Sequence, residues 1–353
     1  MSKPTPQRIR LLVVDDSAVA RRAICKAVAA DPRIEVVGTA ADAYQARDLI
    51  IELNPDVLTL DVHMPRMDGL SFLKILQQHH SVPVVILSSM TPAGSELALL
   101  ALQAGAVEVV GKPGNDEAIA ELSERLIECV WAAATTRRRT ALRIPGPTPA
   151  AVPEYSGTDA ATRLIVIGAS TGGVEALRTV LPRLPANMPA ILIAQHIPAT
   201  FSAIMAQHLS ALCRFPVREA VAGEMLHPGL ALVAPGNRHL SVERTAKGYR
   251  VQVSDSPPVR HCRPSVDVLF RSAAESAGRN AVAALLTGMG NDGARGMQLL
   301  HAAGARTIAE SEESSAIFGM PQAAIQLGVV ERVVSLEEMP RTFIELLREH
   351  TSR

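Results

Sequence analysis

The second half of the chain contains three residues of the types needed for nucleophilic catalysis. Ser170 lies in the stretch LIVIGASTGG, where a G-x-S-x-G pattern follows an apolar run and precedes a predicted helix. Such a turn can lift a hydroxyl above the edge of a sheet, although small residues crowd any strand-to-helix turn. His196 and Asp292 follow two further apolar runs. A hydroxyl, a base and an orienting carboxylate at one edge would form a serine hydrolase.

The three apolar runs are RLIVIGA, PAILIAQ and AVAALLT. Continuous runs of this kind are typical of strands covered on both faces, so we expect three parallel, central strands whose carboxyl ends share one crevice. Taken singly, His196 could be a surface residue and Asp292 a helix cap. Taken together they favour catalysis. The chain order Ser, His, Asp differs from the α/β-hydrolase order, which indicates a different fold.

A competing interpretation rests on GMGNDG, residues 288–293. This stretch fits G-x-G-x-x-G between a strand and a helix, and Glu310 follows where a ribose-binding acid would lie. On that basis the domain would be a dinucleotide-binding oxidoreductase. The Asp292 carboxylate inside the loop is unfavourable beside a pyrophosphate, and little chain remains for further strands. We therefore rank this interpretation second.

The first half of the chain also has polar residues at its predicted strand ends. Asp15 and Asp16 follow the first apolar run, and Asp61, Ser88 and Lys112 follow the third, fourth and fifth. The ends of parallel strands share one edge. Clustered carboxylates repel one another unless a hard cation such as Mg²⁺ joins them, and a lysine there can pair with a phosphoryl oxygen. Single aspartates after strands are usually N-caps, but the ordered set is more specific.

The chain divides into two α/β regions. Strands and helices alternate over residues 1–131, whereas residues 132–161 lose this periodicity and gather Pro, Gly, Thr and Ala, as a flexible linker does. Alternation resumes over residues 162–353. There we expect a doubly wound, mainly parallel α/β domain with an antiparallel hairpin inserted near residues 216–254.

Composition excludes several classes of function. The 35 basic and 35 acidic side chains leave no net charge to attract a nucleic acid. The sequence shows no helix-turn-helix pattern, and the three arginines at 137–139 are too short a run to indicate a nucleic-acid partner. The four cysteines are far apart and show no C-x-x-C spacing, so we expect neither disulfides nor a zinc knuckle. No apolar run could span a bilayer. We expect a cytoplasmic protein without membrane insertion.

The motifs DD, DVHMPRMDG, the fourth-strand serine and GKP resemble those of the receiver domain of two-component response regulators over roughly the first 125 residues. The resemblance implies a flavodoxin-like (βα)5 domain whose Asp61 accepts a phosphoryl group. It also implies the supporting roles: Mg²⁺ held by Asp16, Asp61 and the backbone carbonyl of His63, a metal shell supported by Asp15, and an acyl phosphate contacted by Ser88 and Lys112. Val109 departs from the pattern, because many receivers carry an aromatic switch residue there.

The second region is similar to the catalytic domain of the chemotaxis protein-glutamate methylesterase family, CheB. The resemblance covers residues 162–345 through GASTGG, QHIP, APGNRH, RHCRPSVDVLF, LTGMGNDGARGM and FGMPQAA. It implies a Ser170, His196 and Asp292 triad, with an oxyanion hole formed by the N–H groups of Thr171 and Met289. It further implies a phosphorylation-activated enzyme that demethylates glutamate methyl esters and deamidates certain glutamines on chemoreceptor cytoplasmic domains.

The resemblance also implies partners and regulation. A histidine kinase of the CheA type would be the phosphodonor, and the unphosphorylated receiver would pack over the catalytic crevice. Arg260 and Arg263 precede a predicted helix and could form a cationic rim for an acidic receptor helix, although exposed arginines are ordinary. We expect a monomer that requires no cofactor in its catalytic domain.

Overall fold

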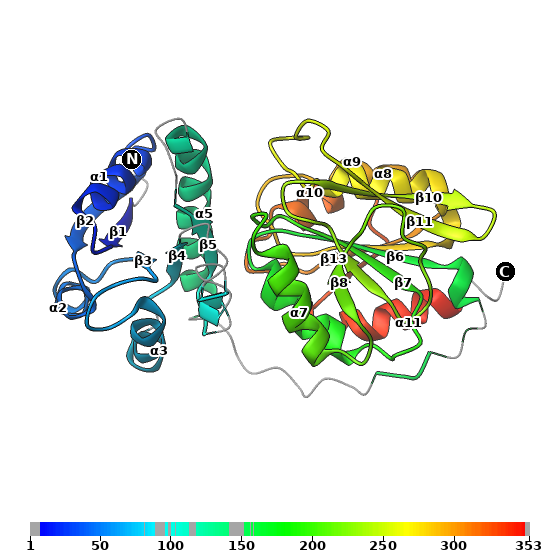
Figure 1. Cartoon of the computed structure of the whole chain (residues 1–353), viewed down its shortest axis with the longest axis horizontal. Coiled ribbons are helices and arrows are strands. Elements are labelled where there is room, and N and C mark those ends of the chain that lie inside the picture. Colours follow the sequence, from blue (N-terminus) through cyan, green and yellow to red (C-terminus); the bar gives the residue numbers. More distant parts are fainter. Residues whose placement is uncertain are drawn as a thin grey trace, which may run out of the picture. The chain divides into compact units, whose positions relative to one another are not determined.

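The computed structural model describes residues 8–80, 82–88, 96–97, 100–102, 104–112, 118–140, 152–155, 157 and 159–349. The chain forms two compact units, Met1–Pro145 and Gly146–Arg353, which we describe separately (Figure 1). Within the described residues, no helix combines the length and apolar character needed to cross a lipid bilayer.

The first unit contains a five-stranded parallel sheet in the order β2-β1-β3-β4-β5. This order is the flavodoxin-like one, so the predicted fold is confirmed. Its strands are β1 (Ile9–Val14), β2 (Ile34–Ala40), β3 (Val57–Asp61), β4 (Val84–Ser88) and β5 (Glu108–Gly111). The described helices are α1 (Ala18–Val28), α2 (Ala43–Leu53), α3 (Gly69–His79) and α5 (Ala118–Thr140).

Three helices of this unit begin at side-chain caps. The side chains of Ser17, Asp42 and Asp68 accept hydrogen bonds from backbone N–H groups in the first turns of α1, α2 and α3. These caps satisfy donors that have no partner within a helix. They therefore fix where each helix begins after its strand.

Helix α5 extends into the segment that we expected to be a linker. The linker was predicted to begin at Ala132, but the helix continues to Thr140. Cys129, Val130, Ala133 and Ala134 are buried in the core of the first unit, which gives the end of this helix an apolar face. Residues 132–140 consist of Ala, Thr and Arg, and this composition does not by itself predict a helix with a buried face.

The far end of the expected linker also differs from the prediction. Tyr155 is buried, and its backbone carbonyl accepts a hydrogen bond of 2.7 Å from the Asn187 side chain. The Tyr155 hydroxyl donates to Asp159, 3.0 Å away. These residues therefore pack on the second unit, whereas residues 141–151 lie outside the described part of the chain.

The second unit contains a seven-stranded sheet in the order β14-β13-β12-β6-β7-β9-β8, and its strand pairs are parallel. The strands are β6 (Leu164–Ala169), β7 (Ala190–Gln195), β8 (Val217–Glu219), β9 (Ala231–Val233), β12 (Ala281–Leu285), β13 (Arg306–Glu310) and β14 (Arg332–Val334). Every residue of β6, β7 and β12 is buried, as the apolar runs predicted.

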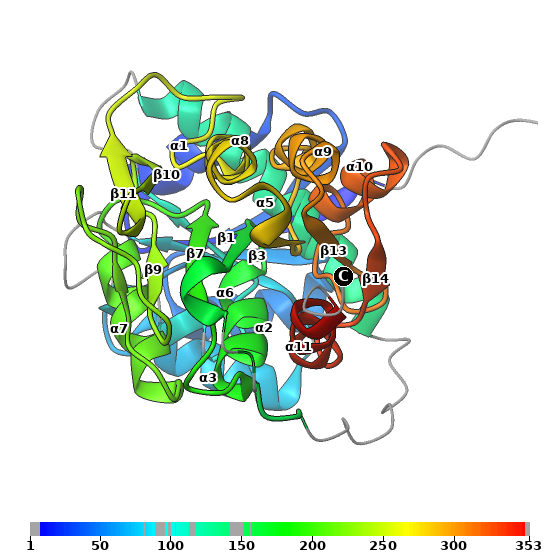
Figure 2. The ribbon, with the colours of Figure 1, turned by 90° about the vertical axis from the view of Figure 1, so that its right-hand side faces the viewer.

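Helices cover both faces of this sheet, as a doubly wound fold requires (Figures 1 and 2). Helices α8 (Val266–Ser276), α9 (Ala294–Ala302) and α10 (Met320–Gln326) lie on one face. Helices α6 (Gly173–Val180), α7 (Ser202–Leu212) and α11 (Met339–Glu349) lie on the other.

The predicted antiparallel insertion is confirmed as the hairpin of β10 (His239–Thr245) and β11 (Gly248–Ser254). Its extent is smaller than expected, because β8 and β9 belong to the parallel sheet. The hairpin is joined to α8 through Val242, whose N–H donates to the Ser272 hydroxyl and whose carbonyl accepts from Ser276.

Two glycines bring the start of α8 close to the sheet. A Cβ at Gly168 would lie 2.2 Å from Val266, and one at Gly293 would lie 2.7 Å from the same side chain. Gly293 also has a φ of +89°, a conformation that residues with a Cβ rarely adopt. The first turn of α8 therefore lies against the carboxyl end of β6 and the loop after β12.

Candidate active site

Three neighbouring strands bring Ser170, His196 and Asp292 into contact. Ser170 directly follows β6, His196 directly follows β7, and Asp292 lies in the loop after β12. The His196 Nδ1 atom is 3.1 Å from the Ser170 hydroxyl oxygen, and Nε2 is 2.8 Å from Asp292 Oδ2. These residues, far apart in the chain, thus form one hydrogen-bonded series.

The imidazole ring is oriented by the carboxylate. Because Asp292 accepts a hydrogen bond from Nε2, the proton of the neutral ring lies on that nitrogen and the Nδ1 lone pair faces Ser170. In the chymotrypsin arrangement the two nitrogens have the opposite roles. The chemistry requires only that one nitrogen be free to accept the serine proton while the other is held, and this arrangement meets that requirement.

Asp292 is buried, with 3% of its surface exposed. Besides His196, it accepts hydrogen bonds from the Ser265 hydroxyl and from the backbone N–H groups of Val266, Asp267 and Gly293, at 2.7 to 3.0 Å. Burial raises the pKa of the Asp292 carboxyl, but the hydrogen bonds from His196 and from the start of α8 outweigh it, so the pKa is lowered. The carboxylate is therefore charged and fixed in position.

His196 binds its proton firmly. Burial lowers the pKa of the imidazole, but the Asp292 carboxylate and the neighbouring Cys262 thiol outweigh burial and raise the pKa to about 9. A base of this strength stabilises the imidazolium that forms when it takes the proton of Ser170. The same strength leaves only a small fraction of the ring neutral near pH 7.

Two loops beside Ser170 are held together by Thr287. Its carbonyl accepts the Ser170 N–H at 2.9 Å, and its hydroxyl donates to the Thr171 carbonyl at 2.9 Å. A Cβ at Gly288 would lie 2.6 Å from that of Ser170, so residues 287–289 lie directly against the serine. Among the described residues, the N–H groups of Thr171 and Met289 donate no hydrogen bond within the chain. They remain available to an oxyanion.

Glu310 does not have the setting of a ribose-binding acid. It is fully buried and accepts hydrogen bonds from the Thr287 N–H at 2.7 Å and the Ser314 hydroxyl at 3.0 Å. Burial raises the pKa of its carboxyl to about 7. A carboxyl enclosed in this way supports the loop beside Ser170 and offers no surface to a nucleotide. The dinucleotide interpretation of residues 288–293 is therefore not supported.

The two arginines of the expected rim, of which Arg260 is exposed and Arg263 partly buried, are bonded within the chain. Arg260 donates to Asp267 at 3.1 Å and to the Asn291 side chain at 2.9 Å. Arg263 donates to the Asn237 side chain at 2.7 and 3.0 Å. Both side chains thus hold loops near the triad, which limits their freedom to contact a substrate.

The acidic residues of the first unit also converge. Lys112 Nζ lies 2.7 Å from Asp15 and 2.8 Å from Asp61, and one oxygen from each of Asp15, Asp16 and Asp61 lies within 4.8 Å of the others. Burial raises the pKa of Asp61, although Lys112 opposes the shift. Burial alone would lower the pKa of Lys112, but Asp15 and Asp61 raise it. Three carboxylates gathered in this way, two of them paired with the ammonium, suit a hard divalent cation.

The remaining predicted receiver residues have clear positions. Ser88 is buried at the end of β4, and its carbonyl accepts the Lys112 N–H at 2.8 Å. The backbone N–H of His63 donates to Asp61 at 3.3 Å, so this backbone passes beside the acidic cluster. Val109 is buried in β5, and a residue that points into the core is not free to swing between two positions as a surface aromatic can.

Comparison with known proteins agrees with the fold of both units. Residues 165–343 match the family profile described as CheB methylesterase, and residues 11–124 match the response regulator receiver domain. A relative from Anaeromyxobacter dehalogenans, named protein-glutamate methylesterase/protein-glutamine glutaminase 4, is 46% identical over 98% of this chain and 96% of its own length. The chain belongs to the CheB methylesterase family.

Other family members support the same assignment. A protein of the same name without the final number, from Chromohalobacter salexigens, is 47% identical over 97% of both chains. The crystal structure of the Thermotoga maritima CheB methylesterase catalytic domain matches with a TM-score of 0.51 and 36% identity, covering 52% of this chain and 98% of that one. This family membership agrees with the doubly wound fold of the second unit.

Sequence reasoning missed several residues around the triad. Ser265, Thr287 and Cys262 all contact triad residues or their loops. Ser265 and Cys262 lie in RHCRPSVDVLF, a stretch used only for family resemblance and for its arginines. The signal that could have identified Ser265 is its position immediately before a helix, where serine commonly bonds nearby donors and acceptors.

Proposed function

We propose that this chain is a protein-glutamate methylesterase that hydrolyses glutamate methyl esters, and deamidates specific glutamines, on the cytoplasmic domains of chemoreceptors. The observation that carries the proposal is the hydrogen-bonded series of Ser170, His196 and Asp292 at one edge of the sheet. The names of the full-length relatives, which combine methylesterase and glutaminase, support the choice of reaction.

The reaction begins when His196 Nδ1 accepts the Ser170 proton as the hydroxyl oxygen attacks the ester carbonyl. Asp292 holds the ring and stabilises its positive charge. The imidazolium then protonates the departing methoxide, and methanol leaves. Water attacks the glutamyl-serine ester with the same histidine as base, which releases glutamate and restores the serine. A glutamine would react in the same way, with ammonia as the leaving group.

The developing oxyanion needs hydrogen-bond donors that point at the position its oxygen takes in the tetrahedral intermediate. The N–H groups of Thr171 and Met289 are the candidates, because they lie in the two loops that Thr287 holds beside Ser170. Donors fixed in advance of the reaction typically contribute roughly two to three orders of magnitude in rate.

The first unit would act as the switch. A histidine kinase of the CheA type would phosphorylate Asp61, and Lys112 would pair with the phosphoryl oxygens. Asp16, Asp61 and the His63 carbonyl would hold Mg²⁺, which supplies charge neutralisation during phosphoryl transfer. Phosphorylation would raise the esterase activity of the second unit. The enzyme would act as a cytoplasmic monomer.

Methanol release from methyl-labelled receptor tests the proposal directly. The full chain should release methanol, acetyl phosphate should increase the rate, and Ser170→Ala should abolish release while leaving the circular dichroism spectrum unchanged. Ser256→Ala is a matched control, because within the described part of the chain that exposed hydroxyl bonds only to the Ser254 hydroxyl. Normal methanol release by Ser170→Ala, or nicotinamide-cofactor binding without methanol release, would overturn the assignment.

A further inference from the structure

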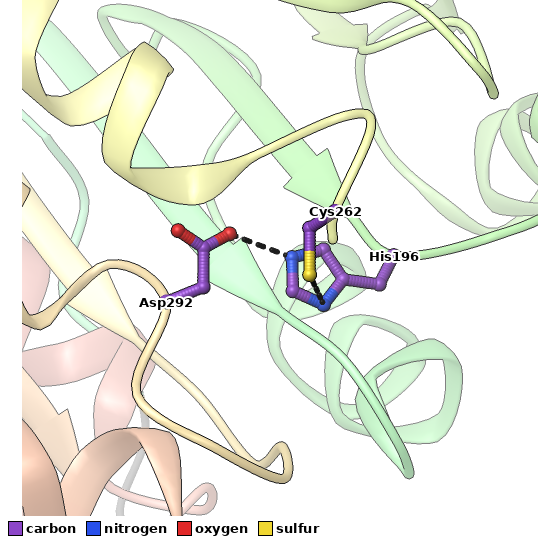
Figure 3. A group of neighbouring side chains, drawn as sticks. All are labelled: His196, Cys262 and Asp292. Carbon is purple, nitrogen blue, oxygen red and sulfur yellow. Dashed lines mark hydrogen bonds and ion pairs between the residues drawn. The ribbon is translucent and has the colours of Figure 1, made fainter. Parts of the chain in front are cut away.

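A thiol lies beside the nitrogen that faces the nucleophile. Cys262 Sγ is 3.7 Å from His196 Nδ1 (Figure 3). The same nitrogen lies 3.1 Å from the Ser170 hydroxyl oxygen. Asp292 is on the other ring nitrogen, as Figure 3 shows. A nitrogen, a sulfur and an oxygen are therefore gathered on one side of the ring, and the proposed esterase reaction uses only two of them.

The backbone is built to hold this thiol in place. Val259 and Cys262 exchange two backbone hydrogen bonds of 2.9 and 3.1 Å, which closes a two-residue turn. Its central residues, Arg260 and His261, have φ values of +51° and +62°. Two consecutive residues with a Cβ in the left-handed region are costly, and such strain is found where the surrounding structure holds a functional group in position. The hydrogen bonds from Arg260 to Asp267 and Asn291 anchor the turn.

The spacing of these atoms fits a tetrahedral zinc ion. With Zn–S near 2.3 Å and Zn–N near 2.05 Å, tetrahedral angles place sulfur and nitrogen about 3.6 Å apart, and the same reasoning places nitrogen and oxygen about 3.3 Å apart. The separations in the structure are 3.7 Å for Cys262 Sγ and 3.1 Å for the Ser170 hydroxyl oxygen, both measured to Nδ1. Both separations from Nδ1 are thus within about 0.2 Å of those that a tetrahedral zinc ion bound to these atoms requires.

Asp292 accepts a hydrogen bond from Nε2, the ring nitrogen that would not bind the metal. A histidine that binds zinc through one nitrogen commonly donates its other N–H to a carboxylate, which fixes the ring and makes it a stronger ligand. The hydrogen bond of 2.8 Å from His196 Nε2 to Asp292 is such a contact. The same carboxylate that orients the ring toward Ser170 therefore also prepares it to bind a metal.

We propose that Cys262, His196 and Ser170 form an inhibitory site for a thiophilic divalent cation of the Zn²⁺ class. Binding requires the Cys262 thiolate and a free Nδ1 lone pair, so the thiol proton and the Nδ1 proton of the imidazolium pass to solvent as the Zn–S and Zn–N bonds form, without any change in oxidation state. The Nδ1 lone pair is donated to the metal and can no longer accept the Ser170 proton. Mg²⁺ is excluded, because it prefers oxygen ligands. Metal binding is independent of the proposed function, whereas inhibition rests on it.

Cobalt substitution in the full chain tests binding without reference to activity. With excess Mg²⁺ present to occupy the carboxylate cluster of the first unit, Co²⁺ should produce a thiolate-to-cobalt band in the near ultraviolet that Zn²⁺ abolishes by displacing the cobalt. The band should be lost in Cys262→Ala and retained in Cys213→Ala, a matched control at another partly buried thiol. If Cys262→Ala does not fold, Cys262→Ser serves instead, because a hydroxyl cannot give this band. A missing band in the wild type, or a band retained in both Cys262 variants, would overturn the site.

Ester hydrolysis tests the inhibitory consequence. Zn²⁺ should inhibit the wild-type chain reversibly, with recovery on addition of a chelator. The inhibition constant should rise by at least about tenfold in Cys262→Ala, since even the loss of an outer-shell partner weakens metal sites by about 10- to 100-fold. Each variant is compared with its own rate in chelator. Equal inhibition of the two chains would overturn the inference. A cobalt band without any zinc inhibition of an active esterase would keep the metal site and contradict its inhibitory role, and an inactive wild type would count against the proposed function instead.

Discussion

The two units place carboxylates at the same kind of sheet edge and use them differently. In the first unit, Asp15 and Asp61 share the Lys112 ammonium, while Asp16 is exposed beside them. In the second, the Asp292 carboxylate is buried and accepts hydrogen bonds from one imidazole and several N–H groups. Both positions follow parallel strands, so topology alone does not distinguish them.

The difference lies in what compensates the negative charge. The cluster around Lys112 is compensated by a single side-chain ammonium, so its carboxylates can still accept a cation and a phosphoryl group. Asp292 is compensated by His196 and by the fixed N–H dipoles at the start of α8, so it orients and stabilises its neighbour. The sheet edge of the first unit is thus suited to binding charged ligands transiently. The sheet edge of the second unit is organised in advance for proton transfer between Ser170 and His196.

Removing the fixed charge should have the largest effect. Asp292→Asn should lower kcat/KM for ester hydrolysis by roughly 10³- to 10⁴-fold, because an amide N–H facing Nε2 favours the tautomer whose proton points at Ser170. Methanol release under single-turnover conditions measures the loss. Asp267→Asn is the matched control, since the Asp267 side chain bonds to the Gly296 N–H and to Arg260, and the contact of this residue with Asp292 is made by its backbone N–H, which asparagine keeps. Comparable losses in the two variants would show that Asp292 acts only through the structure of the loop.

The strength of His196 as a base predicts the pH dependence. The ring must be neutral to accept the serine proton, and its pKa is about 9, so activity is lost as pH falls below that value. Between pH 6 and pH 9, kcat/KM should rise roughly several hundredfold, at about tenfold per unit in the acidic limb. The rate of Ser170→Ala, measured at each pH, corrects for spontaneous hydrolysis. A flat profile across this range would contradict the role of His196 as base.

A substitution in the carboxylate cluster around Lys112 should have a smaller effect on the rate of ester hydrolysis. Asp61→Asn should leave the unstimulated rate intact and abolish the increase caused by acetyl phosphate, which for a coupling between sites is typically about 5- to 150-fold. Asp42→Asn is the control, because asparagine can also cap α2. Stimulation that persists in Asp61→Asn would place the phosphoacceptor elsewhere.

The apolar runs predicted the elements that carry both sites because buried parallel strands tolerate few other sequences. They therefore located the strand ends that present Ser170, His196 and Asp292. Sequence patterns gave wrong predictions where the burial of a residue depends on contacts with a distant segment of the chain. The composition of residues 132–140 indicates a linker, because it does not reveal that Ala133 and Ala134 pack into the core of the first unit. Glu310 fitted a nucleotide motif by its spacing, but burial against Thr287 gives it another role.

By itself, the sequence determined which residues end the strands, because backbone hydrogen bonding and apolar burial act over short stretches of chain. Only the tertiary structure decided that Nδ1 of His196 faces Ser170, that the start of α8 binds Asp292, and that Cys262 lies against the same nitrogen. These contacts join segments far apart in the chain. The contact with Asp292 depends on how closely α8 packs on β6, an approach that Gly168 and Gly293 allow beside Val266.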